Sequence, residues 1–277
     1  SVRQYSTRRT TVGVRLMTMF GSQWMAATGS VDIENSALFE KSSSEMLTIT
    51  ADASSDLQIT TLSFWFKATD VVASGTDATL FAAYTSGKSG NDYMQLRSDG
   101  KLNLGFDVDI LLRTSATYAD GTWYHCVIAV DTTQSTDSNR VKMYVGEVGT
   151  QATLVTAFDG TVANNPKYPA QNYNMESWNV SGETLYIGRI ASAVELYWDG
   201  NISEFCQVNG SQLTPSDFAS GGYPLAQGTV TALASGGGAN SFHLDNASDV
   251  TTDASTQNND FTASDPPPTI STDTPTS

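Results

Sequence analysis

Apolar and polar side chains alternate along much of the chain, most clearly in residues 60–69. There the sequence TTLSFWFKAT places two sets of side chains on opposite faces of an extended segment: Leu62, Phe64 and Phe66 on one, Ser63, Trp65 and Lys67 on the other. A period of two residues is typical of a β-strand, because successive side chains point to opposite faces of a sheet. The segment therefore predicts a strand with an apolar face.

Strand-like patterns recur along the middle of the chain, at residues 78–86, 92–107, 122–131, 140–148, 183–190 and 198–210. Asp99-Gly100 separates two alternating runs, which is a strong signal for a β-hairpin. The longer stretch TWYHCVIAVDTTQSTDSNRVKMYVGEV has two apolar runs around a polar centre and predicts a second hairpin. No long helical period is visible. Many strands separated by turn residues predict an all-β sandwich or jelly roll.

Two terminal segments differ in composition from the strand-rich body, residues 31–218. Residues 1–30 predict an arm that docks on another protein through Arg, Met and aromatic side chains: Arg3, Arg8, Arg9, Arg15, Met17, Met19, Phe20, Trp24 and Met25. Residues 219–277 are rich in Gly and Pro and predict a C-terminal extension, flexible by composition unless something holds it. We therefore expect one domain with an arm at each end.

Charge is distributed unevenly along the 277 residues. The net charge is −15, and residues 1–31 contain four Arg and no acid, which leaves ten cations and 29 acids, a net −19, on the remainder. Such an acidic body repels nucleic acid and anionic membranes. No apolar run approaches the roughly 20 residues needed to span a bilayer. We therefore expect protein partners and several copies in an assembly, with neither nucleic acid nor membrane insertion.

Candidate metal and redox residues are few. Cys126 and Cys206 each lie inside an apolar strand pattern, so buried free thiols are favoured, while a disulfide between neighbouring strands stays open. Together with His125 and His243 they lack the CxxC and HxxxH spacing of zinc sites. Calcium stays open without a motif, because no Asp-rich loop of defined spacing occurs. The sequence therefore predicts no cofactor.

Several segments together resemble laminin-G-like domains of the concanavalin A-like lectin/glucanase class. LSFWFKAT, GTWYHCVIAVDTT, RVKMYVGEV, LYIGRI and WDGNISEFCQVNG are similar, in this order, to recurring strands of that family, over about residues 33–218. The resemblance implies a concanavalin A-like, two-sheet antiparallel jelly-roll sandwich. It also implies a buried, hydrogen-bonded His125, because the family has a His at this strand position as well.

A narrower resemblance lies in DTTQSTDSNRVKMYV and in three C-terminal motifs, His-Leu-Asp (243–245), Asn-Asn-Asp-Phe (258–261) and Asp-Thr-Pro-Thr (273–276). These are similar to laminin-G-like proteins of marine tailed bacteriophages, which implies a structural protein located in the virion. We expect a non-enzymatic appendage on the capsid or tail, in contact with other virion proteins. The sequence has no repeat that would build a fibre shaft of its own. The alternative is a receptor-binding module for host glycans in a tail fibre or tail tip.

Catalytic carboxylates would follow a pattern if the chain were a glucanase of the resembled class. Those enzymes carry them on one strand, spaced Glu-x-Asp-x-x-Glu or Glu-x-Asp-x-Glu, so that both face one cleft. Here Asp32 and Glu34 lack the leading Glu, and Asp107 and Asp109 have no Glu beside them. No GxSxG, P-loop or HExxH motif occurs either. A glycoside hydrolase is therefore the least favoured hypothesis.

Aromatic side chains beside amides give the candidate glycan-binding surface. We expect it in loop 164–179 and the turn that begins at residue 197, with faces and polar groups from Tyr168, Tyr173, Trp178, Tyr197, Trp198 and Asp199. The competing interpretation is that these aromatics fill the rim of a sheet or a subunit contact. It carries more weight, because protein interfaces use the same residues.

Overall fold

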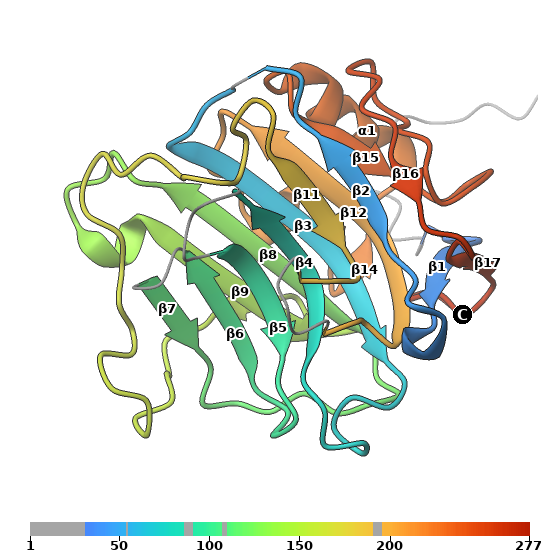
Figure 1. Cartoon of the computed structure of the whole chain (residues 1–277), viewed down its shortest axis with the longest axis horizontal. Helices are drawn as coiled ribbons and strands as arrows, with labels where there is room; N and C mark the ends of the chain where they lie inside the picture. Colours follow the sequence, from blue (N-terminus) through green and yellow to red (C-terminus); the bar gives the residue numbers. More distant parts are fainter. Residues whose placement is uncertain (1–30, 54, 86–90, 107–109, 191–195) are drawn as a thin grey trace, which may run out of the picture.

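The computed structural model describes residues 31–53, 55–85, 91–106, 110–190 and 196–277. Two antiparallel β-sheets pack face to face with the apolar core between them (Figure 1). This confirms the predicted all-β, two-sheet sandwich. The side chains predicted to dock the N-terminal arm lie outside the described residues: Arg3, Arg8, Arg9, Arg15, Met17, Met19, Phe20, Trp24 and Met25.

One sheet, called sheet A, is built around the two longest strands. Its order is β10 (Thr153–Leu154), β9 (Val141–Glu147), β8 (Tyr124–Asp131), β3 (Ile59–Ala68), β12 (Gly200–Asn209), β1 (Ser36–Phe39) and β17 (Thr269–Ser271). A further strand, β15 (Phe242–Leu244), also pairs with β12. One edge of β12 is therefore shared, with β1 along residues 200–202 and β15 along residues 205–207.

The other sheet, called sheet B, contains seven strands of the described chain. Its order is β16 (Thr262–Ala263), β2 (Leu47–Thr50), β11 (Thr184–Ile187), β4 (Ala78–Tyr84), β5 (Asn91–Leu96), β6 (Leu102–Phe106) and β7 (Ile110–Arg113). The remaining described elements are short: the hairpin β13 (Ala219–Ser220) and β14 (Tyr223–Pro224), the helix α1 (Gln227–Gly236), and the 3-10 helices Lys41–Ser43, Asp137–Asn139 and Pro215–Asp217.

Strand β3 shows how the alternation in the sequence produces the core. Leu62, Phe64 and Phe66 are buried between the two sheets. Trp65 points to the outer face of sheet A, where its ring stacks on that of His125 with the centroids 4.6 Å apart. Burial of each large apolar side chain stabilises the fold by about 1.5–3 kcal/mol relative to an exposed one.

Both predicted hairpins are present. Strands β8 and β9 form an antiparallel pair joined by the polar stretch that contains the 3-10 helix Asp137–Asn139. Strands β5 and β6 turn at Asp99-Gly100, where Gly100 has φ of +78° and its N–H donates to Arg97 O. Glycine adopts this left-handed conformation without the steric cost that a side chain would add.

The Gly- and Pro-rich segment 219–277 lies on the sandwich and adds strands to both sheets. β15 joins sheet A, β16 pairs with β2 of sheet B, and β17 pairs with β1. Its last residues are fixed beside the start of the described chain, because Ile33 N–H donates to Thr276 Oγ1 and Ser36 Oγ donates to Asp273 O. The Asp273 carboxylate also accepts hydrogen bonds from Lys67 Nζ and Trp123 Nε1. Composition favoured a flexible extension, but here strand pairing and side-chain hydrogen bonds with the same chain hold the segment.

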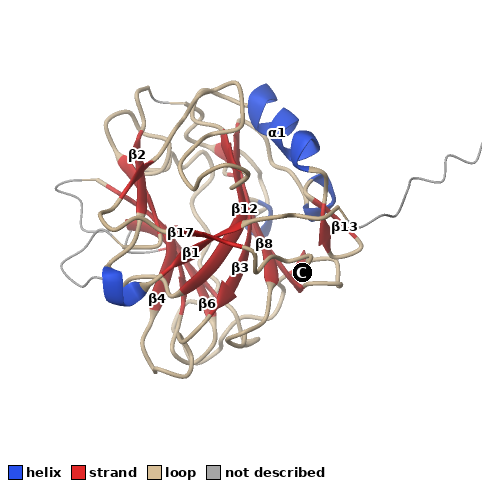
Figure 2. Ribbon diagram, turned by 90° about the vertical axis from the view of Figure 1, so that its right-hand side faces the viewer, coloured by secondary structure: helices blue, strands red, loops and turns tan. Residues whose placement is uncertain are grey.

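Helix α1 was not expected from the sequence. It covers the face of sheet A that points away from sheet B, where Val230 and Ala234 pack on β8 and β12 (Figure 2). Gln227 Nε2 donates to Glu204 Oε1 at 2.7 Å, which fixes its first turn. Helices this short are marginal alone, so packing on the sheet decides the conformation. Among the described residues, no helix is long and apolar enough to cross a membrane.

Cys126 and Cys206 are buried free thiols, as favoured from the sequence. Cys126 belongs to the core between the sheets, whereas Cys206 lies in the cluster under α1 on the outer face of sheet A. Strand β3 separates the two strands that carry them. Burial raises the pKa of both thiols, so neither is a reactive thiolate at neutral pH.

Candidate functional site

The two tryptophans of the predicted glycan surface are core residues. Trp178 is 1% exposed and Trp198 is 0% exposed. Trp178 packs against Phe81 and Phe106, and Trp198 packs edge-on against Phe66. Because a sugar stacks only on an accessible ring face, this burial removes both tryptophans from the predicted stacking platform.

The predicted loop and turn also do not form one surface. Trp198 directly precedes Asp199 and the start of β12 at Gly200, whereas the indole N–H of Trp178 donates to Gln207 near the other end of that strand. Seven residues of extended chain span about 23 Å. The predicted set is therefore divided between opposite ends of the sandwich.

The remaining four predicted residues are partly buried at separate places. Tyr168 and Tyr173 pack on the core, and Tyr168 also borders a hollow of about 260 Å³ at the sandwich edge. Tyr197 lies beneath the Arg189 guanidinium, 5.5 Å from the ring centroid. Burial raises the pKa of Asp199, and acidic neighbours add to that effect while Lys41 opposes it. These residues are not brought together around a common cavity.

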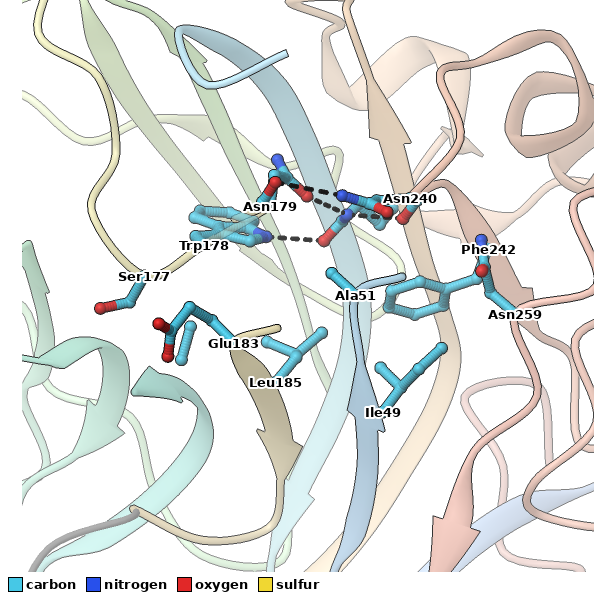
Figure 3. Close-up of a pocket in the computed structure, with 12 residues that line it drawn as sticks. Ile49, Ala51, Ser177, Trp178, Asn179, Glu183, Leu185, Asn240, Phe242 and Asn259 are labelled. Carbon is cyan, nitrogen blue, oxygen red and sulfur yellow. Dashed lines mark hydrogen bonds between the residues drawn. The ribbon is translucent and has the colours of Figure 1, made fainter. Parts of the chain in front are cut away.

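A different site, which we call the rim cleft, lies where β2 and β11 of sheet B approach β12 and β15 of sheet A. Its inner hollow has a volume of about 30 Å³ and is drawn in Figure 3; it is lined by Ile49, Ala51, Ala83, Ser177, Trp178, Asn179, Glu183, Leu185, Gln207, Asn240, Phe242 and Asn259. Its outer groove has a volume of about 320 Å³ and is lined by Thr48, Ile49, Thr50, Asp52, Asn258, Asn259, Asp260 and Thr262. Ile49 and Asn259 border both, so the two compartments adjoin.

A chain of amides fixes one wall of the inner hollow (Figure 3). Gln207 Oε1 accepts from Trp178 Nε1 at 2.7 Å, and Gln207 Nε2 donates to Asn179 Oδ1 and Asn240 O, each also at 2.7 Å. Asn240 Nδ2 in turn donates to Asn179 O and to Ala53 O. Gln207 and Asn179 are 2% and 5% exposed. A buried network with these partners holds its side chains rigidly.

The C-terminal segment supplies the other wall, because it crosses from sheet A to sheet B between β15 and β16. Asp253 holds this crossing: its carboxylate accepts from the backbone N–H groups of His243, Ser255 and Asn259. Asn259 Nδ2 donates to Ala239 O and Ser241 O, both at 2.7 Å. The crossing segment therefore positions Asn259 at the mouth of the inner hollow.

The charge of the rim cleft is negative. Glu183, Asp52 and Asp260 contribute carboxylates, and the described lining residues include no Lys or Arg. Thr48, Thr50 and Thr262 line the outer groove. Thr48 Oγ1 donates to Thr262 O, and the Thr50 hydroxyl lies 3.0 Å from that of Thr184 on the neighbouring strand. Amides, hydroxyls and carboxylates beside an apolar hollow can bind a neutral ligand that has both hydroxyls and a small apolar group.

Of the catalytic candidates considered from the sequence, those that the structure describes do not line this cleft. Asp32 and Glu34 are exposed, and Asp107 and Asp109 lie outside the described residues. His125 Nε2 lies 2.9 Å from Ser63 Oγ, and burial lowers the pKa of His125 to about 3, which agrees with the expected core histidine. His243 is also buried, between Glu204 and Thr231, where it joins β15 to β12 and α1. Among the described residues, no cluster of His, Cys, Asp or Glu could hold a metal ion.

Sequence patterns had singled out only part of the cleft. Trp178 was chosen as a sugar platform, and Asn258, Asn259 and Asp260 belong to a motif used for the phage resemblance. Asn179, Gln207 and Asn240 were missed, because an isolated amide in a strand or loop has no distinguishing local pattern. The Asn-Asn-Asp-Phe motif was the available signal, since its Phe261 packs edge-on against Phe242 and its polar residues line the groove.

Comparisons with known proteins give a family and several similar structures. A family model described as "Concanavalin A-like lectin/glucanases superfamily" matches residues 41–217, which confirms the laminin-G-like class predicted from the strands. No curated protein matches the chain.

Three solved structures illustrate the similarity. A heptameric SAP-like pentraxin from Limulus polyphemus is 17% identical with a TM-score of 0.46, over 87% of this chain and 96% of that one. A putative carbohydrate-binding protein from Bacteroides ovatus is 14% identical with a TM-score of 0.48, over 87% of this chain and 60% of that one. Tailspike protein 2 of the Escherichia coli O157:H7 bacteriophage CAB120 is 12% identical with a TM-score of 0.41, over 70% of this chain and 28% of that one.

Proposed function

Since this chain belongs to the concanavalin A-like lectin/glucanases superfamily, we propose that it is a non-enzymatic, carbohydrate-binding structural protein of a bacteriophage virion. It decorates the capsid or the tail and contacts host-surface glycans through the rim cleft. The observation that carries carbohydrate binding is the pairing of a rigid, amide-walled hollow with a hydroxyl- and carboxylate-lined groove. Convergent polar groups beside apolar walls are the usual composition of a small-ligand site.

The non-enzymatic part of the proposal rests on how the buried carboxylates are used. Asp92 accepts from the backbone N–H of Trp178, Asp253 from three backbone N–H groups, and Glu204 from Gln227 and His243. The pKa of Asp159 lies well below its usual range because Lys101 donates a hydrogen bond to it. Carboxylates tied in this way are structural, whereas a glycosidase needs one that stays protonated to serve as the acid. Glu45 and Asp199, whose pKa values are raised by burial, do not line the rim cleft.

Support for the virion role comes from the three C-terminal motifs that resemble tailed-phage proteins. Each has a structural part in holding the terminal segment: His243 bonds Glu204, Phe261 packs on Phe242, and Asp273 forms an ion pair with Lys67 at 2.6 Å. The three motifs therefore act together to attach the C-terminal segment to the sandwich. They lie beyond residues 41–217, where the family model ends, so the resemblance to tailed-phage proteins includes a part of the chain that the family model does not cover.

Carbohydrate binding is tested by applying the full chain to a panel of immobilised bacterial-surface glycans. Any oligosaccharide that is bound is then incubated with the protein in solution, and new reducing ends, the products of hydrolysis, are measured. We expect at least one glycan to be retained and no reducing ends to appear. New reducing ends that disappear in an Asp52→Asn, Asp260→Asn variant would instead identify a glycoside hydrolase, since these two carboxylates line the same groove. Retention of no glycan would reject the carbohydrate-binding proposal.

The virion role is tested by imaging particles of the phage that encodes the chain. Density for the sandwich on the capsid or tail supports the appendage, and its position decides between a decoration protein and a tail-tip module. Particles made with a chain that lacks residues 1–30 should lose this density, since we propose that the arm attaches the protein. Normal incorporation of the shortened chain would show that the anchor lies elsewhere.

A further inference from the structure

We propose that the rim cleft selects a neutral sugar that carries an N-acetyl group, with the acetyl methyl in the inner hollow and the sugar ring in the outer groove. The inference rests on the proposed carbohydrate-binding function and specifies its ligand. Three features of the cleft lead to it: the size and walls of the hollow, the acceptor oxygens at its mouth, and the charge around it.

The inner hollow fits a small apolar group. Its volume of about 30 Å³ exceeds the roughly 10–15 Å³ that one water needs, but it is far too small for a sugar ring. Ile49, Leu185 and Phe242 supply apolar walls. The Gln207 amide in the opposite wall is already bonded to Trp178, Asn179 and Asn240, so a methyl against the apolar walls is favoured over a hydroxyl there, which would be costly to bury without a partner. The hollow is therefore a receptor for a substituent of a larger ligand.

Acceptor oxygens lie beside the hollow. Asn240 and Asn259 each use their side-chain NH₂ for two backbone carbonyls, which fixes both amide groups. Among the described residues, no hydrogen bond ends on Oδ1 of either side chain. An acetamido group combines a methyl with an N–H donor one bond beyond the carbonyl carbon. It can therefore place the methyl among the apolar walls and donate its N–H to one of these oxygens.

The outer groove suits the rest of the sugar. Its volume of about 320 Å³ lies at the lower end of the range found for ligand sites. Thr48, Thr50 and Thr262 offer hydroxyls that donate or accept, and Asp52 and Asp260 offer acceptors for sugar hydroxyls. Ile49 lies between the two compartments, so a ring in the groove can direct a substituent into the hollow.

Charge narrows the choice of sugar. Glu183 at the hollow and Asp52 and Asp260 at the groove make the cleft negative, and no cation of its described lining offsets them. A sugar carboxylate would be repelled by these carboxylates, because like charges a few ångströms apart are only weakly screened by salt. The cleft is thus expected to accept N-acetylglucosamine or N-acetylgalactosamine and to reject N-acetylneuraminic acid, although all three carry the acetamido group.

The experiment measures the affinity of the full chain, by titration NMR or calorimetry, for N-acetylglucosamine, N-acetylgalactosamine, glucose, glucosamine and N-acetylneuraminic acid. We expect at least one N-acetylhexosamine to bind about ten-fold or more tightly than glucose, since one methyl and one hydrogen bond are gained. Glucosamine separates the acetyl group from the charge, because its amine is attracted to the carboxylates but cannot fill the hollow. Glucose or glucosamine binding as tightly as the N-acetylhexosamines would overturn the inference while leaving carbohydrate binding in place.

Two variants assign the binding to the cleft. Ile49→Trp fills the junction of the two compartments and should reduce N-acetylhexosamine affinity at least ten-fold. Ile270→Trp places the same side chain on β17, 42% exposed and outside the cleft lining, and should leave the affinity unchanged. A folded Ile49→Trp variant with the affinity of the parent would overturn the assignment.

A double variant, Asp52→Asn with Asp260→Asn, tests the charge argument; it changes two exposed side chains and keeps their shape. It should raise the affinity for N-acetylneuraminic acid at least three-fold relative to the affinity for N-acetylglucosamine, because only the acidic sugar is relieved of repulsion when the two charges are removed. An unchanged rejection of the acidic sugar would contradict the charge argument. Failure of all five sugars, together with failure on the wider glycan panel, would instead reject the carbohydrate-binding function itself.

Discussion

The two ends of the sandwich each hold a buried tryptophan, and they differ in the polar groups around it. At the rim cleft, Trp178 donates to Gln207, whose amide is bonded in turn to Asn179 and Asn240. At the opposite end, no described residue accepts a hydrogen bond from the indole N–H of Trp198. One end thus has a satisfied amide network, and the other leaves a buried donor without a described partner.

Charge sharpens the contrast. At the cleft end, neutral amides form one wall of the hollow and the groove carboxylates Asp52 and Asp260 are exposed, whereas the carboxylates of Glu45 and Asp199 near Trp198 are buried or partly buried. There burial raises the pKa values of Asp199 and Glu45, and the negative charge of Glu40 adds to both shifts. Asp199 also adds to the shift of Glu45, and Asp70 and Asp120 add to that of Asp199. The two tryptophans, each beside polar residues in the sequence, therefore lie in unlike environments. In the part of the chain that the structure describes, the amide end combines a hydrogen-bonded wall with a cavity, which is why we assign ligand binding to it.

The largest difference between the two ends is expected in the free energy of unfolding, when an amide side chain of β12 is replaced at each end. Gln207→Leu leaves three partners at the cleft end without their hydrogen bond, and we expect it to lower the free energy of unfolding by about 3 kcal/mol. Asn201→Leu is the matched change near the other end, where Asn201 donates to Ser36 Oγ, and should cost about 1 kcal/mol. Urea unfolding measures both. Equal losses would show that the amide network adds no stability of its own.

A smaller difference is expected when each indole is replaced by a phenyl ring. Trp178→Phe removes the 2.7 Å hydrogen bond to Gln207, whereas Trp198→Phe removes a donor that no described residue satisfies. Both changes also lose packing, so the informative quantity is their difference. We expect Trp178→Phe to be the more destabilising by about 1–2 kcal/mol. Thermal and urea unfolding of both variants check this, and a larger loss for Trp198→Phe would contradict it.

The smallest expected effect is the pH dependence contributed by Asp199. Its raised pKa means that the folded protein binds the proton more readily than the unfolded chain, so this carboxylate destabilises the fold once pH rises above its folded pKa. Asp199→Asn should therefore stabilise the protein at pH 7, by less than about 1 kcal/mol because the group is partly exposed and screened. The gain should vanish below about pH 3.9, where the carboxylate is protonated in both states.

The matched control for this change is Asp52→Asn at the cleft end, where the carboxylate is exposed. Melting temperatures of both variants and the parent are compared at pH 7 and pH 3. A gain for Asp199→Asn that persists at pH 3, or an equal gain for Asp52→Asn at pH 7, would show that the charge environment of Asp199 is not the cause.

By itself, the sequence determined the sandwich. The alternation of Leu62, Phe64 and Phe66, the Asp99-Gly100 turn and the paired runs of residues 122–148 each predicted an element that the structure contains. These signals are local, because strand periodicity and turn geometry depend on residues a few positions apart. The order of such segments also identified the laminin-G-like class, and that resemblance implied the buried His125. The burial of Cys126 and Cys206 followed from their place inside apolar strand patterns.

Tertiary structure alone decided where the site lies. Whether Trp178 or Trp198 is exposed depends on which distant segments cover it, and no local pattern records that. The rim cleft brings together Ile49, Trp178, Gln207, Asn240 and Asn259, which come from five separate parts of the chain. Its outer wall depends on the Gly- and Pro-rich segment, whose composition favours flexibility until strand pairing and Asp253 hold it in place. Long-range strand pairing therefore overrode the flexibility that the local composition favours. The same pairing determines where the candidate site lies.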